Sequence, residues 1–464
     1  MMATNEGGWM TAVFSGEEIL LICNARLASG LMPDDAGKLV SDTRLLAEGD
    51  WYIAFAGDTF DGHDFLGDAF AAGALGAVVV ERQNYPIGSQ SFPLIAVEDT
   101  LEAYHALARN WRRRIGPKLV GVTGSSGKTT TKEMCAAIFC KSRRCHYSAK
   151  NENNEFGVPK TLLSMPDDTQ VAVIEMAMRG LGQIDQLAKC TLTDVAIITN
   201  AGTAHIELLG SKENIAKAKC ELLENMKPEK GVAILGSNDE HLVKQARSVF
   251  SGKMHIFSED LIEMDSVDPE ASRFRIKGSD KIFEVKAHGM PLISDAWCAI
   301  IAARELGLQD DEIAEGLKFF KTIGGRGTKM TTANGALVID ESYNANPESV
   351  RAAVLALNDA NAYTQSKKYV VLGDLLELGA QGPALLEELG AWLKDQNLFM
   401  LITVGSLARH IYAGASSAKF EVMHCQDMQI AEDELRKRMD DDSCVLIKGS
   451  RGARLDKLVG ALVV

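Results

Sequence analysis

The residues best suited to chemistry lie in a glycine-rich string, residues 120–130, that reads V-G-V-T-G-S-S-G-K-T-T. Backbone N–H groups of small residues, together with a helix N-terminus, form a cradle for anions. The general pattern expects glycine where Val122 stands, and the chain has glycines at 121 and 124 instead. If the string does not bind an anion, its glycines would serve only to form a turn. We predict nucleotide phosphate binding by Gly124, Ser125, Ser126, Gly127, Lys128, Thr129 and Thr130, with Thr129 also a Mg²⁺ ligand.

Other polar residues follow apolar runs farther along the chain. Glu175 ends the run 171–174, where a carboxylate could hold Mg²⁺ or stand in solvent. His205 follows the run 195–199, and such a histidine alone is more often structural. Lys219 lies in the helical pattern 214–224 near two other lysines, which taken alone favours a solvated position. Asn151, Asn153 and Asn154 could contact a substrate or only form a turn.

The elements that must position these residues alternate between strand and helix. This alternation predicts an α/β fold whose central domain has a parallel sheet. Breaks at Gly116-Pro117 and at the glycine-rich residues 323–327 separate three expected domains, 1–115, 116–323 and 324–464. We expect strands at 51–55, 77–80, 119–123, 171–175, 195–199, 336–340, 369–372, 400–404 and 444–448, and helices at 100–114 and from Lys128.

Composition narrows the class of protein. The chain has 464 residues, and a length of about 100–200 residues per domain favours three domains. A net charge of −14 argues against general affinity for nucleic acid, and no apolar run is long enough to span a membrane. The nine cysteines are scattered without a zinc-site spacing. We therefore expect a cytoplasmic enzyme with reduced thiols, no nucleic-acid partner and no membrane insertion.

Several strings, in order and spacing, resemble the Mur ligases, the ATP-dependent amide-forming enzymes of peptidoglycan precursor synthesis. The resemblance covers nearly the whole chain. Within the family, residues 342–347, 373–379 and 448–452 are most similar to the branch that joins D-alanyl-D-alanine to UDP-N-acetylmuramoyl-tripeptide. The matching strings are Thr123–Thr130, Asn151–Asn154 with Gly157 and Pro159, Glu175-Met176, Asn200–His205, Ala218-Lys219, Asp340–Pro347, Gly373–Gly379 and Lys448–Gly452.

The resemblance implies an N-terminal UDP-substrate domain, a central P-loop ATPase domain and a C-terminal Rossmann-like domain that binds the incoming dipeptide. It also implies the use of ATP and two Mg²⁺ ions. We expect a monomer, although the sequence does not give the oligomeric state. Lys128, Glu175, His205 and Lys219 would be catalytic, and Thr129, Glu175, His205 and a carbamylated Lys219 would be the metal ligands. Arg326 and Asp340 would contact ATP. Substrate contacts would come from Ser41, Thr43, Arg44, Asn151, Asn153, Asn154, Asn344, Asn346, Lys448 and Arg451.

The implied reaction begins with attack of a carboxylate on the γ-phosphate of ATP. The resulting acyl phosphate is then displaced by the amine of the dipeptide, giving the amide, ADP and phosphate. Charge neutralisation and alignment would be the main catalytic effects. Because the expected site is divided between domains, we also expect a closing motion about Gly324–Gly327 that excludes water.

The chain departs from the family pattern at a few positions. Ala177 and Gln183 replace a glycine and a common glutamate. Pro291, Leu292 and Asp295 stand where the family has a His-Asn pair and a further asparagine near the adenine. Rival interpretations are a sister ligase, such as the diaminopimelate-adding enzyme or folylpolyglutamate synthase, and a non-catalytic nucleotide-binding scaffold. The third residue of the acceptor peptide cannot be read from the sequence.

Overall fold

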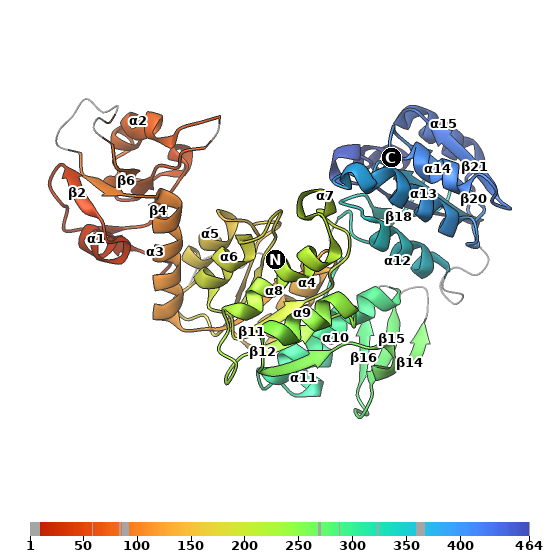
Figure 1. Ribbon diagram of the computed structural model, residues 1–464, viewed down its shortest axis with the longest axis horizontal. Coiled ribbons are helices and arrows are strands. Elements are labelled where there is room, and N and C mark those ends of the chain that lie inside the picture. The colour runs from red at the N-terminus through yellow and green to blue at the C-terminus, as the bar shows by residue number, and fades with distance from the viewer. Residues whose placement is uncertain are drawn as a thin grey trace. The chain divides into compact units, whose positions relative to one another are not determined.

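The computed structural model describes residues 10–57, 59–82, 85, 92–267, 271–286, 288–322, 324–358 and 367–463 (Figure 1). Its chain forms two compact units, and each is described by itself. The first comprises residues 1–121, 143–176 and 185–194, and the second comprises residues 122–142, 177–184 and 195–464.

The N-terminal part of the first unit contains a five-stranded sheet in the order β2-β7-β6-β5-β4. Strands β4 to β7 are parallel, and β2 pairs antiparallel with β7. The sheet strands are β2 (Arg26–Ser29), β4 (Leu39–Val40), β5 (Trp51–Ile53), β6 (Gly76–Val80) and β7 (Leu94–Val97), and β1 (Phe14–Ser15) pairs with β3 (Ala36–Gly37). Its helices are α1 (Gly16–Cys23), α2 (Leu66–Ala71) and α3 (Thr100–Ile115).

Helix α3 illustrates how local sequence sets the bounds of an element. Asp99 caps its start, because Oδ1 accepts hydrogen bonds from the N–H groups of Leu101 and Glu102, at 2.7 and 3.1 Å. Gly116 ends it in the left-handed conformation, with φ of 68°. The helix predicted to stop at Gly116-Pro117 is therefore confirmed.

The middle of the chain forms a six-stranded sheet in the order β13-β12-β11-β8-β10-β9. The pairs β9–β10, β11–β12 and β12–β13 are parallel. The strands are β8 (Lys118–Thr123), β9 (Cys145–Tyr147), β10 (Val171–Glu175), β11 (Val195–Ile198), β12 (Val232–Leu235) and β13 (Lys253–Ile256). The helices of this region are α4 (Lys128–Ser142), α5 (Gly157–Leu163), α6 (Gln183–Thr191), α7 (Ile206–Leu209), α8 (Lys212–Glu224), α9 (Glu240–Val249), α10 (Met290–Glu305) and α11 (Asp310–Leu317).

A small antiparallel sheet precedes α10 in the chain. It has the order β14-β15-β16, and its strands are β14 (Ile262–Val267), β15 (Ser272–Ile276) and β16 (Ile282–Val285). Half-exposed charged residues alternate with buried ones along β15. The sequence analysis missed this sheet.

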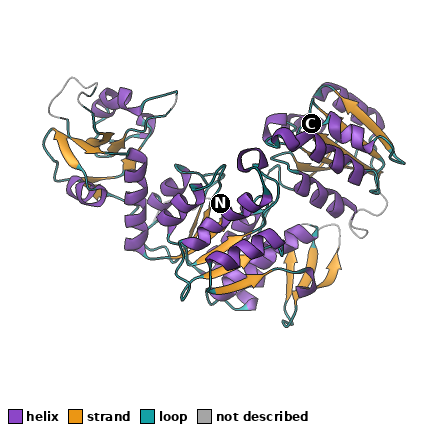
Figure 2. Ribbon diagram, viewed as in Figure 1, coloured by secondary structure: helices purple, strands orange, loops and turns teal. Residues whose placement is uncertain are grey.

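The C-terminal sheet has six strands in the order β17-β18-β22-β19-β20-β21, and helices pack around it (Figure 2). Only β17 is antiparallel to its neighbour. Its strands are β17 (Thr328–Thr331), β18 (Leu337–Glu341), β19 (Lys367–Gly373), β20 (Met400–Val404), β21 (Glu421–Cys425) and β22 (Ser443–Lys448). Its helices are α12 (Pro347–Asn358), α13 (Gly382–Leu393), α14 (Arg409–Ala415), α15 (Met428–Arg438) and α16 (Asp456–Val463).

The structure contains each strand that the sequence analysis placed, with ends that differ by no more than two residues. The α/β fold class with a central parallel arrangement is confirmed. The domain boundaries at 115 and 323 stay predictions, and Ile323 lies outside the described residues. All nine cysteines are free. Within the described ranges, no helix combines the length and apolarity needed to cross a membrane.

Candidate functional site

The phosphate loop of the second unit connects β8 to α4, as predicted. Its glycines allow other residues to approach the backbone closely. Gly124 has φ of 153°, and a Cβ there would lie 1.8 Å from Oγ1 of Thr199. Gly127 has φ of 78°, and a Cβ there would lie 2.4 Å from Oδ1 of Asp295. The glycines are thus required for close packing as well as for the turn.

Asn200, which follows β11, holds this loop in place. Its Oδ1 accepts a hydrogen bond from the N–H of Ser126 at 3.1 Å, and its backbone oxygen accepts one from the N–H of Ser125 at 3.1 Å. Lys128 begins α4 and donates from Nζ to the backbone oxygen of Gly124 at 2.8 Å. The loop is therefore preorganised. Asn200 belongs to the string 200–205 but was not predicted as a site residue.

Lys219 lies on the buried face of α8 and is only 2% exposed. Lys212 and Lys217 on the same helix are exposed. Burial, and then the positive charge of Lys128, hold the pKa of the Lys219 amine well below its usual range. The interpretation of Lys219 as a solvated helix lysine is wrong, because the side chain is enclosed in a place that disfavours its ammonium form.

His205 precedes α7 in the left-handed conformation, with φ of 64°. Its Nδ1 lies 2.7 Å from Oε2 of Glu377, a residue of the string 373–379 that was given no function. Burial lowers the pKa of His205. The Glu377 carboxylate opposes that effect, whereas the charges of Lys128 and Lys219 lower this pKa further. Lys128, His205 and Lys219 thus share one electrostatic environment.

Two predicted residues of the first unit contact each other. Glu175 ends β10 and is 1% exposed, so the alternative of a solvated carboxylate is wrong. Nδ2 of Asn153 donates to its Oε1 at 2.8 Å. Asn154 supports the start of α5, where its Oδ1 accepts from the N–H of Gly157 at 2.9 Å. Asn151 is exposed.

The predicted substrate contacts near the N-terminus are Ser41, Thr43 and Arg44. Thr43 and Arg44 lie in a short 3₁₀ turn, Thr43–Leu45, that follows Ser41. Arg44 is exposed and pairs with Asp42 through two contacts, Nε to Oδ1 at 2.8 Å and Nη2 to Oδ2 at 2.6 Å. Those hydrogen bonds lower the pKa of Asp42 to about 2. The guanidinium is reachable from solvent, so an anionic ligand would have to compete with Asp42.

Two predicted arginines lie over the same aromatic ring in the C-terminal region. The guanidinium carbon of Arg326 is 4.0 Å from the ring centroid of Tyr343, and that of Arg451 is 5.6 Å from it. Gly325 accepts a hydrogen bond from the Tyr343 N–H, and Gly327 donates one to the backbone oxygen of Asp340. The residues predicted as a hinge are therefore bonded to β18 and the turn after it.

The other predicted residues of this region are engaged in local contacts. Lys448 is 3% exposed and therefore is not a surface lysine. It donates to Glu341 at 2.9 Å and to the backbone oxygen of Asn344 at 3.1 Å. Asn346 caps α12 by accepting from the N–H of Ser349 at 2.8 Å. Asp340 accepts from the N–H of Ser342 at 3.0 Å.

Asp295, one of the departures from the family pattern, lies on α10 against the phosphate loop. Its carboxyl faces Gly127 and is buried. Burial raises the pKa of Asp295 to about 8, although a hydrogen bond with Thr131 and the charge of Arg326 act in the opposite direction. A protonated carboxyl at this place can donate a hydrogen bond and adds no negative charge to the loop.

Comparison with known proteins gives the family. The model of the Mur ligase middle domain matches residues 122–303, and that of the Mur ligase, glutamate ligase domain, matches residues 325–451. The UDP-N-acetylmuramoyl-tripeptide--D-alanyl-D-alanine ligase of Bacillus subtilis (strain 168) is 34% identical over 429 residues, 92% of this chain and 93% of the relative. The chain belongs to the Mur ligase family. It is therefore an ATP-dependent amide ligase.

Solved Mur ligase structures agree with this assignment. Crystal structure I of MurF from Acinetobacter baumannii aligns with a TM-score of 0.87 at 28% identity, covering 98% of this chain and 99% of that one. MurF ligase from Thermotoga maritima in complex with ADP aligns with a TM-score of 0.80 at 26% identity, covering 92% and 97%. The three-domain Mur ligase architecture predicted from the sequence is thus confirmed.

The first prediction concerns Gly127. Gly127→Ala should weaken ADP binding by at least about tenfold, because the new Cβ forces either the loop or Asp295 to move. Gly180→Ala is the matched control, since a Cβ there meets nothing within 4 Å. Isothermal titration calorimetry with ADP measures the difference. Equal affinity in both variants would show that the close approach is unnecessary.

The second prediction concerns the buried carboxyl of Asp295. The folded protein keeps its proton up to about pH 8, whereas the unfolded chain releases it above about pH 4. Asp295 therefore destabilises the fold increasingly as pH rises between these values, by at most about 1.4 kcal/mol per pH unit. The melting temperature of Asp295→Asn should rise relative to the wild type over this range and level off above it.

Differential scanning calorimetry at several pH values tests this trend. The same substitution at Asp311, whose side chain is 86% exposed and pairs with Lys281 at the surface, is the control and should give a much smaller trend, because a surface ion pair contributes little to stability. A constant difference for Asp295→Asn as well would mean that this carboxyl is ionised throughout.

Proposed function

We propose that this Mur ligase joins D-alanyl-D-alanine to UDP-N-acetylmuramoyl-tripeptide, with ATP as the energy source and an acyl phosphate as intermediate. The name that the B. subtilis relative carries supports these substrates. Residues 1–115, 116–323 and 324–464 would serve the UDP end, ATP and the dipeptide respectively. Because UDP-linked precursors and ATP are intracellular compounds, we place the reaction in the cytoplasm.

The observation that carries the proposal is the environment shared by Lys128, His205 and Lys219. A phosphate loop alone would suit many nucleotide-binding proteins. A buried lysine whose ammonium form is disfavoured, next to an imidazole and to the loop lysine, suits transfer of a phosphoryl group between two anions. A non-catalytic scaffold has no need of such an enclosed amine.

The first step must bring a carboxylate to the γ-phosphate against charge repulsion. In our proposal, Lys128 lies beside the transferred phosphoryl group, and the backbone N–H groups of the loop orient the β-phosphate. The substrate carboxylate oxygen forms a bond to phosphorus as the bond to ADP breaks. Arg326 neutralises the phosphate charge from the C-terminal region, and Asp340 accepts from the ribose.

The residues present fit a role in binding Mg²⁺. Carbamylation of a lysine requires a neutral amine, and the burial of Lys219 favours that form. The carbamate would then offer oxygen ligands beside the imidazole of His205. Thr129 supplies a hydroxyl, and Glu175 keeps its predicted role as a ligand of the other ion. Bound Mg²⁺ would supply charge neutralisation between the reacting anions.

The second step needs an amine aligned with the acyl phosphate and protected from water. We propose that Arg451 pairs with the carboxylate of the dipeptide, because its guanidinium is exposed beside Tyr343. Lys448, fixed by Glu341 and Asn344, would lie near the acyl phosphate. Asn153 would contact the muramoyl peptide, and Arg44 the diphosphate of the UDP end.

The third prediction tests the reaction itself. The purified protein should release phosphate from ATP only when both UDP-N-acetylmuramoyl-tripeptide and D-alanyl-D-alanine are present. A coupled phosphate assay with each substrate omitted in turn measures this requirement. Turnover with a single amino acid in place of the dipeptide would favour a sister ligase, and binding of ATP without any turnover would favour a scaffold.

The fourth prediction tests the role of Lys219. Lys219→Ala should lower kcat by about 100-fold or more, and millimolar formate or acetate should restore part of the activity by supplying the missing carboxylate. Lys217→Ala, an exposed position on the same helix, should retain activity. Full activity of Lys219→Ala would exclude the carbamate, and loss without rescue would leave the residue only a packing role.

A further inference from the structure

Glu377 and His205 form a contact that the proposed function leaves unexplained. Glu377 lies in the loop after β19, and His205 lies between β11 and α7. Nδ1 of the imidazole is 2.7 Å from Oε2 of the carboxylate. The two atoms are at ion-pair distance, and the carboxylate raises the pKa of His205 against the effect of burial.

Both residues adopt the left-handed conformation, which L-residues with a side chain rarely do. The φ angle is 64° for His205 and 62° for Glu377. A strained backbone persists only where its surroundings enforce it, and such residues gather at functional sites. The strain does not serve stability, because the side chains are 23% and 43% exposed and an ion pair of that kind stabilises a fold very little.

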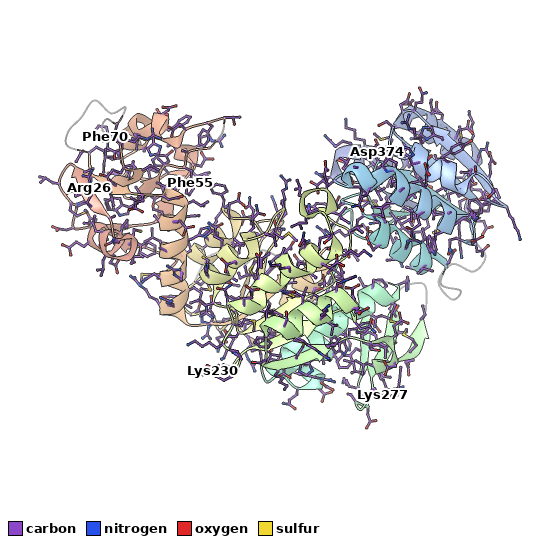
Figure 3. All side chains as sticks on the ribbon, in the orientation of Figure 1. Arg26, Phe55, Phe70, Lys230, Lys277 and Asp374 are labelled. Carbon is purple, nitrogen blue, oxygen red and sulfur yellow. The ribbon has the colours of Figure 1, made fainter. Side chains whose placement is uncertain are left out.

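The loop that carries Glu377 is fixed from both ends. Asp374, which is labelled in Figure 3, lies at its start. It accepts hydrogen bonds from the N–H groups of Leu407 and Ala408, both at 2.8 Å. At its end, Gly379 has φ of 58° and lies so close to Glu207 that a Cβ would be 2.9 Å from that side chain. The carboxylate is therefore held beside the imidazole rather than reaching it by chance.

A second carboxylate from the C-terminal region binds the same segment without touching His205. Glu348, in the first turn of α12, accepts from Oγ1 of Thr203 at 2.7 Å and from its N–H at 3.2 Å. Glu348 and Glu377 thus both contact the segment 202–210. Of these two acids, only Glu377 lies beside the imidazole ring of His205. Substitution of Glu348 is therefore the control for effects that come only from the loss of a negative charge or from weaker attachment of this segment.

We infer that Glu377 is a positioning residue for His205: it engages Nδ1, so that Nε2 is the ring nitrogen presented to a metal ion. This inference rests on the proposed metal role of His205. Histidine ligands of metals commonly donate their second N–H to a carboxylate, which fixes the tautomer and the orientation of the ring. The contact also links a metal ligand to the loop after β19, so the C-terminal region contributes to the metal site without binding the ion.

The fifth prediction compares Glu377→Ala with Glu348→Ala in the full-length protein. With a non-hydrolysable ATP analogue present, Glu377→Ala should weaken Mn²⁺ binding by about ten- to 100-fold. Glu377→Gln, whose amide oxygen can still accept from Nδ1, should give an intermediate affinity. Glu348→Ala should stay within about twofold of the wild type. Electron paramagnetic resonance of free Mn²⁺ measures the affinities.

A second measurement needs no metal. In protein labelled with ¹⁵N-histidine, the chemical shifts of the ring nitrogens report the tautomer of each histidine. The signals of His205 are identified as those that disappear in His205→Gln. The Nδ1–H form should lose population in Glu377→Ala but not in Glu348→Ala. An unchanged tautomer in Glu377→Ala would overturn the inference. Failure of the wild type to bind Mn²⁺ with the nucleotide analogue would instead overturn the metal role of His205, and with it this part of the proposed function.

Discussion

The chemistry that we propose for this chain depends on keeping the amine of Lys219 out of water, and the structure leaves this residue only 2% exposed. An ammonium group in that place loses its hydration and meets the positive charge of Lys128 as well. Both effects favour the neutral amine, which is the form that can react with CO₂. A lysine on the exposed face of α8, such as Lys217, has neither property. Burial thus makes Lys219 a potential metal ligand, whereas Lys217 lies on the exposed face of the same helix.

Strand β11 and the residues after it connect the phosphate loop to His205. Thr199 and Asn200 contact the phosphate loop, and His205 follows after one short turn. The carboxyl end of a single parallel strand therefore fixes the loop and supplies the imidazole. Because β11 is buried along its whole length, movement of its end would disturb the core. This gives the site a rigid base, as preorganised catalysis requires.

The sequence was sufficient for the features that depend on local patterns. Apolar runs predicted β5, β6, β8, β10, β11, β18, β19, β20 and β22, although other strands such as β7 and β12 were not placed. Glycine spacing predicted the loop between β8 and α4. The small sheet β14-β15-β16 was missed because its half-exposed charged residues interrupt the apolar pattern. Asn154 and Asn346 were predicted as substrate contacts, yet each makes a hydrogen bond to the backbone three residues later, as asparagine often does at the start of a helix.

Contacts between distant residues could not be read in this way. Asn200 with Ser126, Asp295 with Gly127 and Glu377 with His205 each join segments more than 70 residues apart. Asp295 shows what such a contact changes. As a residue type it suggests a negative charge where the family pattern has an amide near the nucleotide. Packed against the loop, its pKa is raised to about 8, so at neutral pH it is mostly a neutral carboxyl. A neutral carboxyl resembles a carboxamide in size and can donate a hydrogen bond. The substitution therefore adds no negative charge to the loop that we propose binds the phosphates of ATP, and the departure at this position does not count against that proposal.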